Sequence, residues 1–167
     1  MKFTIRSTSP EDAHGMLQAY HSAVHVTAAR DYPPDVLRLW SPSVDESRVV
    51  AKKKRLEQTL GVTVISYVAV AESGEIIGLG ELVPPDTLGA VYVAASAGGK
   101  GVASALLRVL EARARELGMQ RLRMESSLTA ATFYAGRGFQ ELGRDQHQLA
   151  DGVHMACVRM EKVLSGN

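Results

Sequence analysis

A glycine-rich turn carries the strongest chemical signal in this sequence. The turn and the start of the segment after it read Gly98, Gly99, Lys100, Gly101, Val102, Ala103 and Ser104. Glycines let successive backbone N–H groups point at one spot, and a helix that starts there adds the positive end of its dipole. This pattern favours the binding of a phosphate or pyrophosphate, and Lys100 can add a positive charge.

Two common nucleotide-binding turns do not fit these glycines. The GxxxxGK[ST] spacing of a P-loop is absent. The glycine spacing of a Rossmann turn is absent too, and so is an acid about 20 residues further on that would contact a ribose. Glu125 is the nearest acid and comes slightly late. Taken alone, the turn is equally consistent with a flexible loop that caps a helix.

A second segment separates these alternatives. Residues 133–139 read Phe-Tyr-Ala-Gly-Arg-Gly-Phe and follow the next predicted strand. Together the two segments resemble the GCN5-related N-acetyltransferases. In that family a bulged strand leads into an (Arg/Gln)-x-x-Gly-x-(Gly/Ala) turn and a long helix, and a later helix carries Phe-Tyr-x-x-x-Gly-Phe. The resemblance is specific over residues 63–142 and general elsewhere. The segment from Arg30 to Pro34, followed by Trp40, is similar to a branch of small bacterial acetyltransferases.

Two positions depart from the family pattern. The usual Arg or Gln at the start of the turn is Gly98, so a side-chain contact to the pyrophosphate is lost, and Lys100 is the candidate to replace it. The Asn often found near the second motif is Ser127, which has fewer hydrogen-bonding groups than an amide. We expect both changes to weaken binding of the co-substrate, while the backbone donors remain.

The resemblance implies transfer of an acetyl group from acetyl-CoA to an amine, with no metal. Acetyl-CoA would lie between splayed strands 88–94 and 121–126. Backbone groups of Tyr92 and Val93 would hold the pantetheine and polarise the acetyl carbonyl. The expected co-substrate contacts are Tyr92, Val93, Gly98, Gly99, Lys100, Gly101, Val102, Ala103, Ser104, Ser127 and Tyr134.

Tyr134 matches the family's general acid, which protonates the departing thiolate. The alternatives for Tyr134 are packing with Phe133 in the core, or only a hydrogen bond to the sulfur. Glu81 is the first candidate for the base, because acids on the preceding strand in this family often reach the amine through water. Glu125, His21 and His25 are further candidates. Cys157 is expected to be a small buried residue rather than a nucleophile.

Aromatic and imidazole side chains predict the wall of an acceptor pocket. The expected substrate contacts are His21, His25, Tyr32 and Trp40, together with Tyr20 and Val24. Trp40 is expected in a loop, where a core role would not explain it, and this favours an aromatic acceptor. Core packing is the alternative for Tyr20. The basic run from Lys52 to Arg55 is typical of a solvated helix face.

The function expected from these residues is acetylation of a small-molecule amine. Acetylation of a protein or peptide N-terminus is the alternative enzyme function, and it would need a groove that the bulky 30–43 segment tends to close. A degenerate acyl-CoA-binding regulatory module is the alternative outside enzymes. Gly98 and Ser127 favour that module, whereas Tyr134 argues against it.

The elements that position these residues follow from periodicity. We expect strands over residues 3–7, 63–71, 76–83, 88–94, 121–126 and 153–163, with a short one after Gly138, and helices over 13–24, 44–60, 102–117 and 129–136. A break at residues 31–35 ends the first helix. This order predicts an α+β fold over a single domain, residues 1–167. Its sheet is mixed and mostly antiparallel, and it is flanked by helices.

The composition excludes several classes of partner. The 167 residues carry 19 Lys and Arg against 18 Asp and Glu, a formal net charge of +1. No overall field therefore favours nucleic acid or an anionic membrane. The single cysteine excludes an internal disulfide and a multi-cysteine metal site. No segment has the apolar length of a membrane span or of a secretory signal.

We therefore expect a cytoplasmic protein that has no metal and does not bind nucleic acid or membrane. A homodimer is also expected, because this family often pairs through late strands and the segment 153–163 could supply a sheet edge.

Overall fold

The computed structural model describes residues 1–164, so the last three residues of the domain predicted over 1–167 lie outside the described residues. The described chain forms one seven-stranded sheet in the order β1-β2-β3-β4-β5-β7-β6. The strands are β1 (Phe3–Ser7), β2 (Ile65–Ala71), β3 (Ile76–Val83), β4 (Thr87–Val93), β5 (Arg121–Ser127), β6 (Gln140–Gln148) and β7 (His154–Val163). Neighbours are antiparallel except for β4 and β5. The mixed, mostly antiparallel sheet predicted from the sequence is confirmed.

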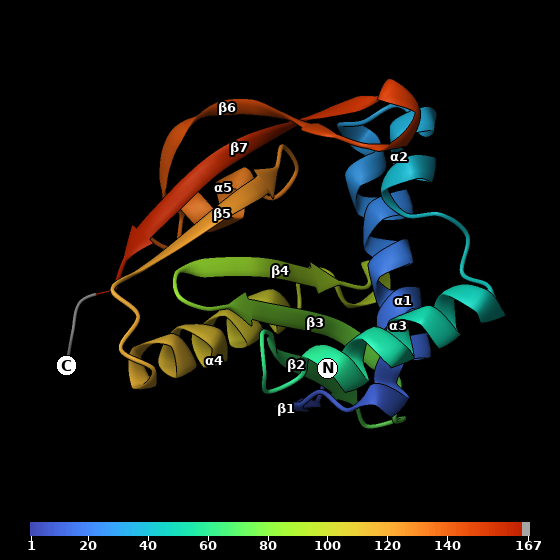
Figure 1. Ribbon diagram of the computed structural model, residues 1–167, viewed down its shortest axis with the longest axis horizontal. Helices are drawn as coiled ribbons and strands as arrows, with labels where there is room; N and C mark the ends of the chain where they lie inside the picture. Colours follow the sequence, from blue (N-terminus) through green and yellow to red (C-terminus); the bar gives the residue numbers. More distant parts are fainter. Residues whose placement is uncertain (165–167) are drawn as a thin grey trace.

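The sheet divides between β4 and β5. These two strands pair at one position only, Thr87 with Arg123, where the Arg123 N–H also donates to the Asp86 carbonyl at 2.7 Å. Beyond that point the strands diverge in a V (Figure 1). On the β3 side, Glu81 pairs with Ala90 and Leu82 with Leu88, so β4 carries one extra residue, Gly89. A bulge of this kind bends a strand and increases its local twist.

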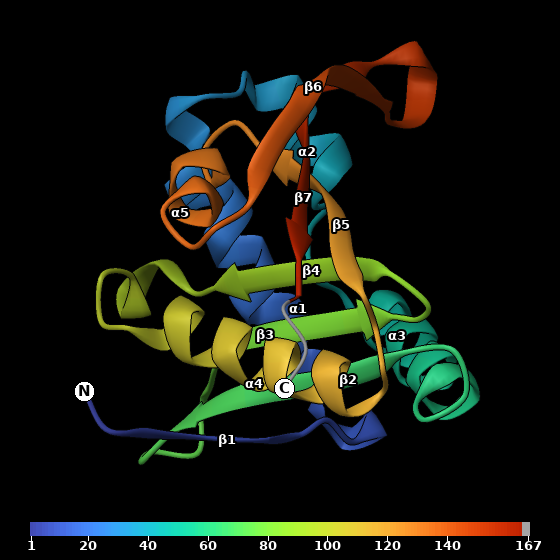
Figure 2. The ribbon, with the colours of Figure 1, turned by 90° about the vertical axis from the view of Figure 1, so that its left-hand side faces the viewer.

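Helices cover both faces of the sheet. Helices α1 (Ala13–Ser22) and α3 (Glu46–Thr59) lie on one face, where Met16 and Leu56 pack against Val68. Helices α4 (Val102–Glu116) and α5 (Ala131–Ala135) lie on the other, and Figure 2 shows α4 and α1 on opposite sides of β3. Residue 78 is glycine because a Cβ there would lie 3.0 Å from side-chain atoms of Val102 and Leu106 in α4. Nowhere in residues 1–164 is there a helix with the length and apolar character needed to cross a bilayer.

The first helical region is longer than its sequence pattern predicts. After α1 the chain continues through a π-helical segment (Ala23–Thr27) and a 3₁₀ turn (Ala28–Arg30), and then forms α2 (Pro34–Trp40). The expected break is present at residues 31–33, but the expectation that Trp40 lies in a loop is wrong. Trp40 is the last residue of α2, a helix of seven residues that starts at a proline. Seven residues are too few to show a clear helical period.

Tyr32 fastens this N-terminal region to the far half of the sheet. Its buried hydroxyl donates to the Ala156 carbonyl at 2.6 Å and accepts from the Leu128 N–H at 2.8 Å. Around it Val36 and Leu37 of α2 pack in one buried cluster with Met155 of β7. The wide end of the V is therefore bridged by side chains from both halves.

The edge of the sheet differs from the prediction. Residues 154–163 form β7, which pairs with β5 on one side and with β6 on the other. The segment 153–163 is therefore interior, and the expectation that it supplies an edge is wrong. The outer strand on that side is β6. After α5 the chain forms β6 at the edge, and β7 then fills the position between β6 and β5.

We predict that Tyr32→Phe destabilises the protein by about 1–3 kcal/mol, because two backbone groups lose their buried partner. Urea unfolding would measure the loss. Tyr67→Phe is the matched control, since the Tyr67 hydroxyl has no hydrogen-bond partner within residues 1–164. Equal losses in the two variants would show that the Tyr32 hydroxyl does not hold the two halves together.

Candidate active site

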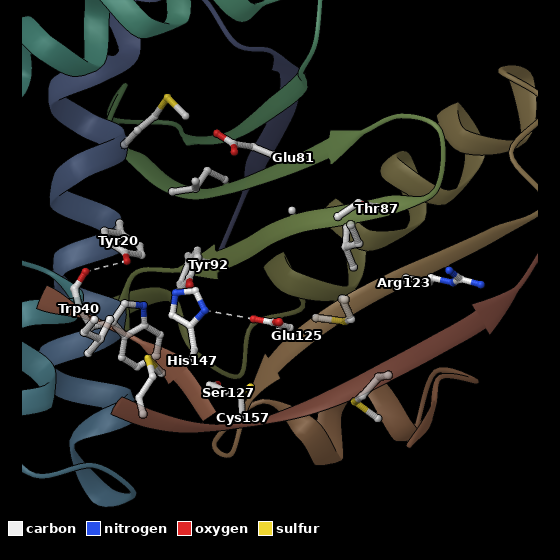
Figure 3. A pocket seen from close by; sticks show the side chains of 18 of the residues that line it. Tyr20, Trp40, Glu81, Thr87, Tyr92, Arg123, Glu125, Ser127, His147 and Cys157 are labelled. Carbon is white, nitrogen blue, oxygen red and sulfur yellow. Dashed lines mark hydrogen bonds and ion pairs between the residues drawn. The ribbon is translucent and has the colours of Figure 1, made fainter. Parts of the chain in front are cut away.

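A cleft of about 1210 Å³ lies on the α1 and α3 face and reaches into the V between β4 and β5 (Figure 3). Its apolar floor includes Leu79 of β3, Leu88 of β4, and Met124 and Met160 of the far half. Both halves of the sheet therefore contribute, and the cleft exists because β4 and β5 separate.

Three aromatic side chains form one end of the cleft. Tyr20 stands edge-on to Tyr92 with ring centroids 4.6 Å apart, and Trp40 lies 6.3 Å from Tyr92. The Tyr20 hydroxyl donates to the Trp40 carbonyl at 3.0 Å, which ties α1 to the end of α2. Burial raises the pKa of Tyr92 to about 12, so it is a neutral phenol at physiological pH. Two predicted site residues, Tyr92 and Trp40, are thus brought together.

Glu81 faces the cleft from β3. Its carboxylate lies 3.5 Å from the Lys52 ammonium of α3, and both side chains are about four-fifths buried, with 20% and 23% of their side-chain surface exposed. Arg48 and Arg55 of the same helix also line the cleft. The basic run predicted to be a solvated helix face is therefore divided, because Lys52 and Arg55 face the cleft while Lys53 pairs with Glu11 at 3.0 Å.

The opposite wall carries an acid–base pair that the sequence pattern did not reveal as a unit. Nδ1 of His147 on β6 lies 3.2 Å from Oε2 of Glu125 on β5, and both side chains are about half exposed (Figure 3). Glu125 is one of the predicted candidate bases, whereas His147 is not among the predicted site residues. No local signal marks His147, because the pair forms only through the β5-β7-β6 strand order.

Ser127 and Cys157 lie opposite each other on β5 and β7, at the wide end of the cleft. The Ser127 hydroxyl accepts from the Ala130 N–H at 3.1 Å, so it also holds the turn before α5. Cys157 is buried, and burial first, then the charges of Glu125 and Asp145, raise the pKa of its thiol. A thiol of this kind is a poor nucleophile at neutral pH.

The glycine turn lies at the start of α4, outside the lining of this cleft. Gly99 and Gly101 have φ angles of +70° and +82°, and a Cβ added at either would meet nothing within 4 Å. Among residues 1–164 no side chain caps α4 at Gly101, and the first N–H groups of a helix have no partner within it. Lys100 donates to the Ser96 carbonyl at 2.9 Å, so its ammonium folds back onto the loop.

Arg137 is a further cation at this turn, and it was not among the predicted site residues. Its guanidinium lies 3.8 Å from the centroid of the Phe133 ring and donates to the Ser104 hydroxyl. The signal was present in the sequence, since Arg137 stands inside the Phe-Tyr-Ala-Gly-Arg-Gly-Phe segment. Only the fold shows that this segment packs beside the start of α4.

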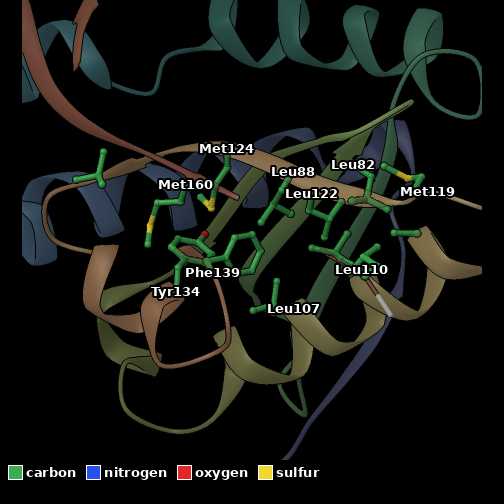
Figure 4. Packing of buried hydrophobic residues seen from close by; sticks show 13 residues of the cluster. Leu82, Leu88, Leu107, Leu110, Met119, Leu122, Met124, Tyr134, Phe139 and Met160 are labelled. Carbon is green, nitrogen blue, oxygen red and sulfur yellow. The ribbon is translucent and has the colours of Figure 1, made fainter. Parts of the chain in front are cut away.

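Tyr134 lies behind the cleft floor. Its ring stands edge-on to Phe133 and Phe139, with centroids 5.1 and 5.4 Å away. It belongs to one buried cluster with Leu88 and Met124, both of which also line the cleft (Figure 4). Burial raises the pKa of the Tyr134 phenol, which keeps its proton at neutral pH. Within residues 1–164 the hydroxyl has no hydrogen-bond partner, so its proton is available.

Three predicted acceptor contacts are engaged elsewhere. Tyr32 acts as a buried clamp, because its hydroxyl bonds the Ala156 carbonyl and the Leu128 N–H and so holds the N-terminal region against the far half of the sheet. His21 and His25 stack 4.0 Å apart and both reach Ser41 at the end of α2, at 3.3 Å to its hydroxyl and 2.7 Å to its carbonyl. Neither histidine lines the cleft. Burial first, then the neighbouring His25, lowers the pKa of His21.

Comparison with known proteins identifies the family. The model of the acetyltransferase (GNAT) domain matches residues 42–164. The chain belongs to the GNAT family. The resemblance seen in the two sequence segments is confirmed, and the protein is a GNAT-type N-acetyltransferase. No curated protein matches the sequence.

Solved structures agree with this acetyltransferase over nearly its whole length. A GCN5-related N-acetyltransferase from Rhodopseudomonas palustris has a TM-score of 0.84 at 26% identity, covering 98% of this chain and 97% of that chain. A ribosomal-protein-alanine N-acetyltransferase from Brucella melitensis has a TM-score of 0.72 at 25% identity, covering 96% and 99%. A phosphinothricin acetyltransferase from Sinorhizobium meliloti, solved with AcCoA, shares the fold at 20% identity, with a TM-score of 0.73 and coverage of 100% and 91%.

We predict that His21 makes the acetyltransferase less stable in mild acid. Its pKa is lower in the folded than in the unfolded chain, so the unfolded chain takes up more protons below about pH 6.5, the ordinary histidine value. Stability is then full above that pH and falls as the pH drops through it. Melting temperatures from pH 7.5 to 5.5 should fall less steeply in His21→Gln than in the wild type. His14→Gln, an exposed position of α1, should keep the wild-type slope, and equal slopes in all three proteins would contradict the assignment.

Proposed function

We propose that this acetyltransferase moves the acetyl group of acetyl-CoA directly to the amine of a small molecule. The observation that most supports this proposal is the V between β4 and β5. On one face of the sheet it opens into the charged and aromatic cleft, and on the other it borders the buried cluster that contains Tyr134, with the start of α4 nearby. Acetyl-CoA and acceptor can then approach from opposite faces and meet in the gap.

The residues present fit acetyl-CoA as co-substrate. Open space above Gly99 and Gly101, beside an uncapped helix start, suits a pyrophosphate held by backbone N–H groups. Arg137 adds a charge there, in place of the Arg or Gln that Gly98 replaces. Thr129, in the turn after β5, has a buried hydroxyl oxygen without a partner in the described chain. A pantetheine amide beside Ser127 would supply one.

In the proposed reaction the amine attacks the thioester carbonyl. Backbone groups of Tyr92 and Val93, on the diverging part of β4, polarise that carbonyl. Glu81 accepts the proton that the amine loses, and Tyr134 gives its proton to the departing thiolate. General acid–base steps of this kind contribute about 10²–10⁴-fold each. The buried Cys157 supports direct transfer, because burial raises the pKa of its thiol and makes it a poor carrier for the acetyl group.

The clamp at Tyr32 supports a small acceptor over a peptide. An extended peptide needs a groove that is open at both ends, and the bonds from Tyr32 to Ala156 and Leu128 close the wide end of the V. The Brucella melitensis relative is named as a ribosomal-protein-alanine N-acetyltransferase. Peptide acetylation is therefore the second function to test, using N-terminal peptides beside a panel of small amines.

We predict that acetyl-CoA stabilises the protein by about 2.7 kcal/mol when present at 100 times its dissociation constant. Thermal unfolding with increasing acetyl-CoA would show this, and release of free thiol with an amine panel would show transfer. An unchanged melting temperature at millimolar acetyl-CoA would contradict the proposed function. Binding without transfer to any amine or peptide would favour the regulatory module.

We predict that Gly101→Val abolishes acetyl-CoA binding while the chain still folds. The valine side chain would fill the space where the backbone approaches the pyrophosphate. Gly118→Val is the matched control, because Gly118 has a similar φ of +73° and equally open surroundings at the other end of α4. Calorimetric titration should show wild-type affinity in the control. The same affinity in both variants would mean that the turn only caps the helix.

We predict that Tyr134→Phe lowers kcat by about 10²-fold, the low end for general acid catalysis. The ring and its packing stay, and the KM for acetyl-CoA should change little, since the lost interaction belongs to the transition state. Tyr67→Phe controls for loss of a phenol elsewhere. A higher KM at unchanged kcat would assign Tyr134 to ground-state contact with the sulfur. A kcat change below about threefold, under 1 kcal/mol, would count against the acid role.

A further inference from the structure

The α3 wall of the cleft carries more positive than negative charge. Arg48, Lys52 and Arg55 are spaced by four and then three residues, which puts them on one face of the helix, and all three line the cleft. Glu81 is the acid paired with this wall, through its 3.5 Å contact with Lys52. Arg48 donates to the Pro42 and Ser43 carbonyls, which orient it without neutralising it. Within residues 1–164, Arg48 and Arg55 take part in no salt bridge.

The cations of the opposite wall are compensated. Arg123 lies 3.7 Å from Asp86 and 3.8 Å from Glu161, and Arg159 lies 3.6 Å from Asp145. The surplus positive charge of the cleft is therefore concentrated on α3, next to the carboxylate of β3.

This arrangement discriminates between classes of amine. A simple ammonium ion gains from Glu81 but is repelled by the guanidinium groups of Arg48 and Arg55, which have no salt bridge within residues 1–164. In a compound that carries an anion beside its amine, the anion is attracted to the same guanidinium groups, and this attraction offsets their repulsion of the amine. Lys52 and Glu81 present a positive and a negative group 3.5 Å apart. An α-amino acid, whose amine and carboxylate are joined through one carbon, presents the complementary pair.

We propose that the acceptor is a zwitterion of this kind, an amine with an adjacent carboxylate or similar oxyanion. The oxyanion lies against Lys52 and Arg55, and the amine lies against Glu81. This inference rests on the proposed function and names its substrate class.

The location of Glu81 agrees with the transfer geometry. Glu81 pairs with Ala90 across the β3–β4 ladder, at the bulge where β4 has left β5. Burial is the main cause of the raised pKa of Tyr92, and the charge of Glu81 adds to it; Tyr92 is the residue whose backbone is proposed to meet the acetyl carbonyl. An amine held by Glu81 therefore lies beside the part of β4 whose backbone is proposed to meet the acetyl carbonyl.

The test compares amino acids with their decarboxylated amines, so that each pair differs only in the carboxylate. Suitable pairs are alanine with ethylamine, leucine with 3-methylbutylamine, and phenylalanine with 2-phenylethylamine. Binding to the protein saturated with coenzyme A is followed by the fluorescence of Trp40, the single tryptophan of the chain, which lines the cleft. Transfer is followed by thiol release with acetyl-CoA. We expect the acid of the best pair to be favoured by about tenfold or more in Kd and in kcat/KM.

Two variants of α3, each of which removes one positive charge, test whether the preference for the amino acid depends on a charge that lines the cleft. Arg55→Gln should weaken binding of the amino acid by about fivefold and should strengthen binding of the plain amine, since a like charge is removed. Lys54→Gln removes the same charge one residue away, on an exposed side chain outside the cleft, and should change neither.

The inference is overturned if each amine matches or exceeds its amino acid, or if Arg55→Gln and Lys54→Gln behave alike. It is also overturned if acetyl-CoA binds but no pair binds or reacts. A failure of the proposed function looks different, because acetyl-CoA would then leave the melting temperature unchanged.

Discussion

The separation of β4 from β5 is the constraint on which the rest of the structure depends. Adjacent strands normally share a full ladder of hydrogen bonds, yet these two pair only at Thr87 and Arg123. Beyond that pair, the backbone N–H and C=O groups that each strand directs into the gap are not paired with the other strand. Such edges readily accept another extended chain. A pantetheine arm has amides that can pair in this way. The missing ladder is thus both the cost of the fold and the source of its binding site.

The two halves of the sheet are held together by other means. At the narrow end the Arg123 N–H bonds to Asp86, and at the wide end Tyr32 bonds to both Ala156 and Leu128. Between them the cluster around Tyr134 packs against both halves. The same residues that keep the V from opening further also bring the proposed acid within reach of the gap, so stability and chemistry share one set of contacts.

The sequence predicted features that depend on neighbours along the chain. The glycine turn, the long helix after it and the Phe-Tyr segment are local patterns, and they sufficed to identify the family, while the order of strands and helices predicted the sheet type. Features that depend on distant pairing were missed. The Tyr32 clamp joins residues 124 apart, the Glu125–His147 pair needs the β5-β7-β6 order, and Arg137 reaches Ser104 across 33 residues. The basic run of α3 misled for a related reason, because only its packing against β3 decides which charges face the cleft.

The Lys52–Glu81 pair shows how weakly held a recognition element can be. Only about a fifth of each side chain is exposed, so the desolvation of the two charges offsets much of their attraction. Replacing the Lys52–Glu81 contact by two ion pairs with a zwitterion therefore costs little stability. The bound zwitterion also displaces the water that competes for both charges. A plain amine that pairs with Glu81 would leave the Lys52 ammonium largely buried without its carboxylate, which is the costly outcome for an ion pair. The same contact that looks like a modest structural salt bridge would then favour a doubly charged acceptor over a singly charged one.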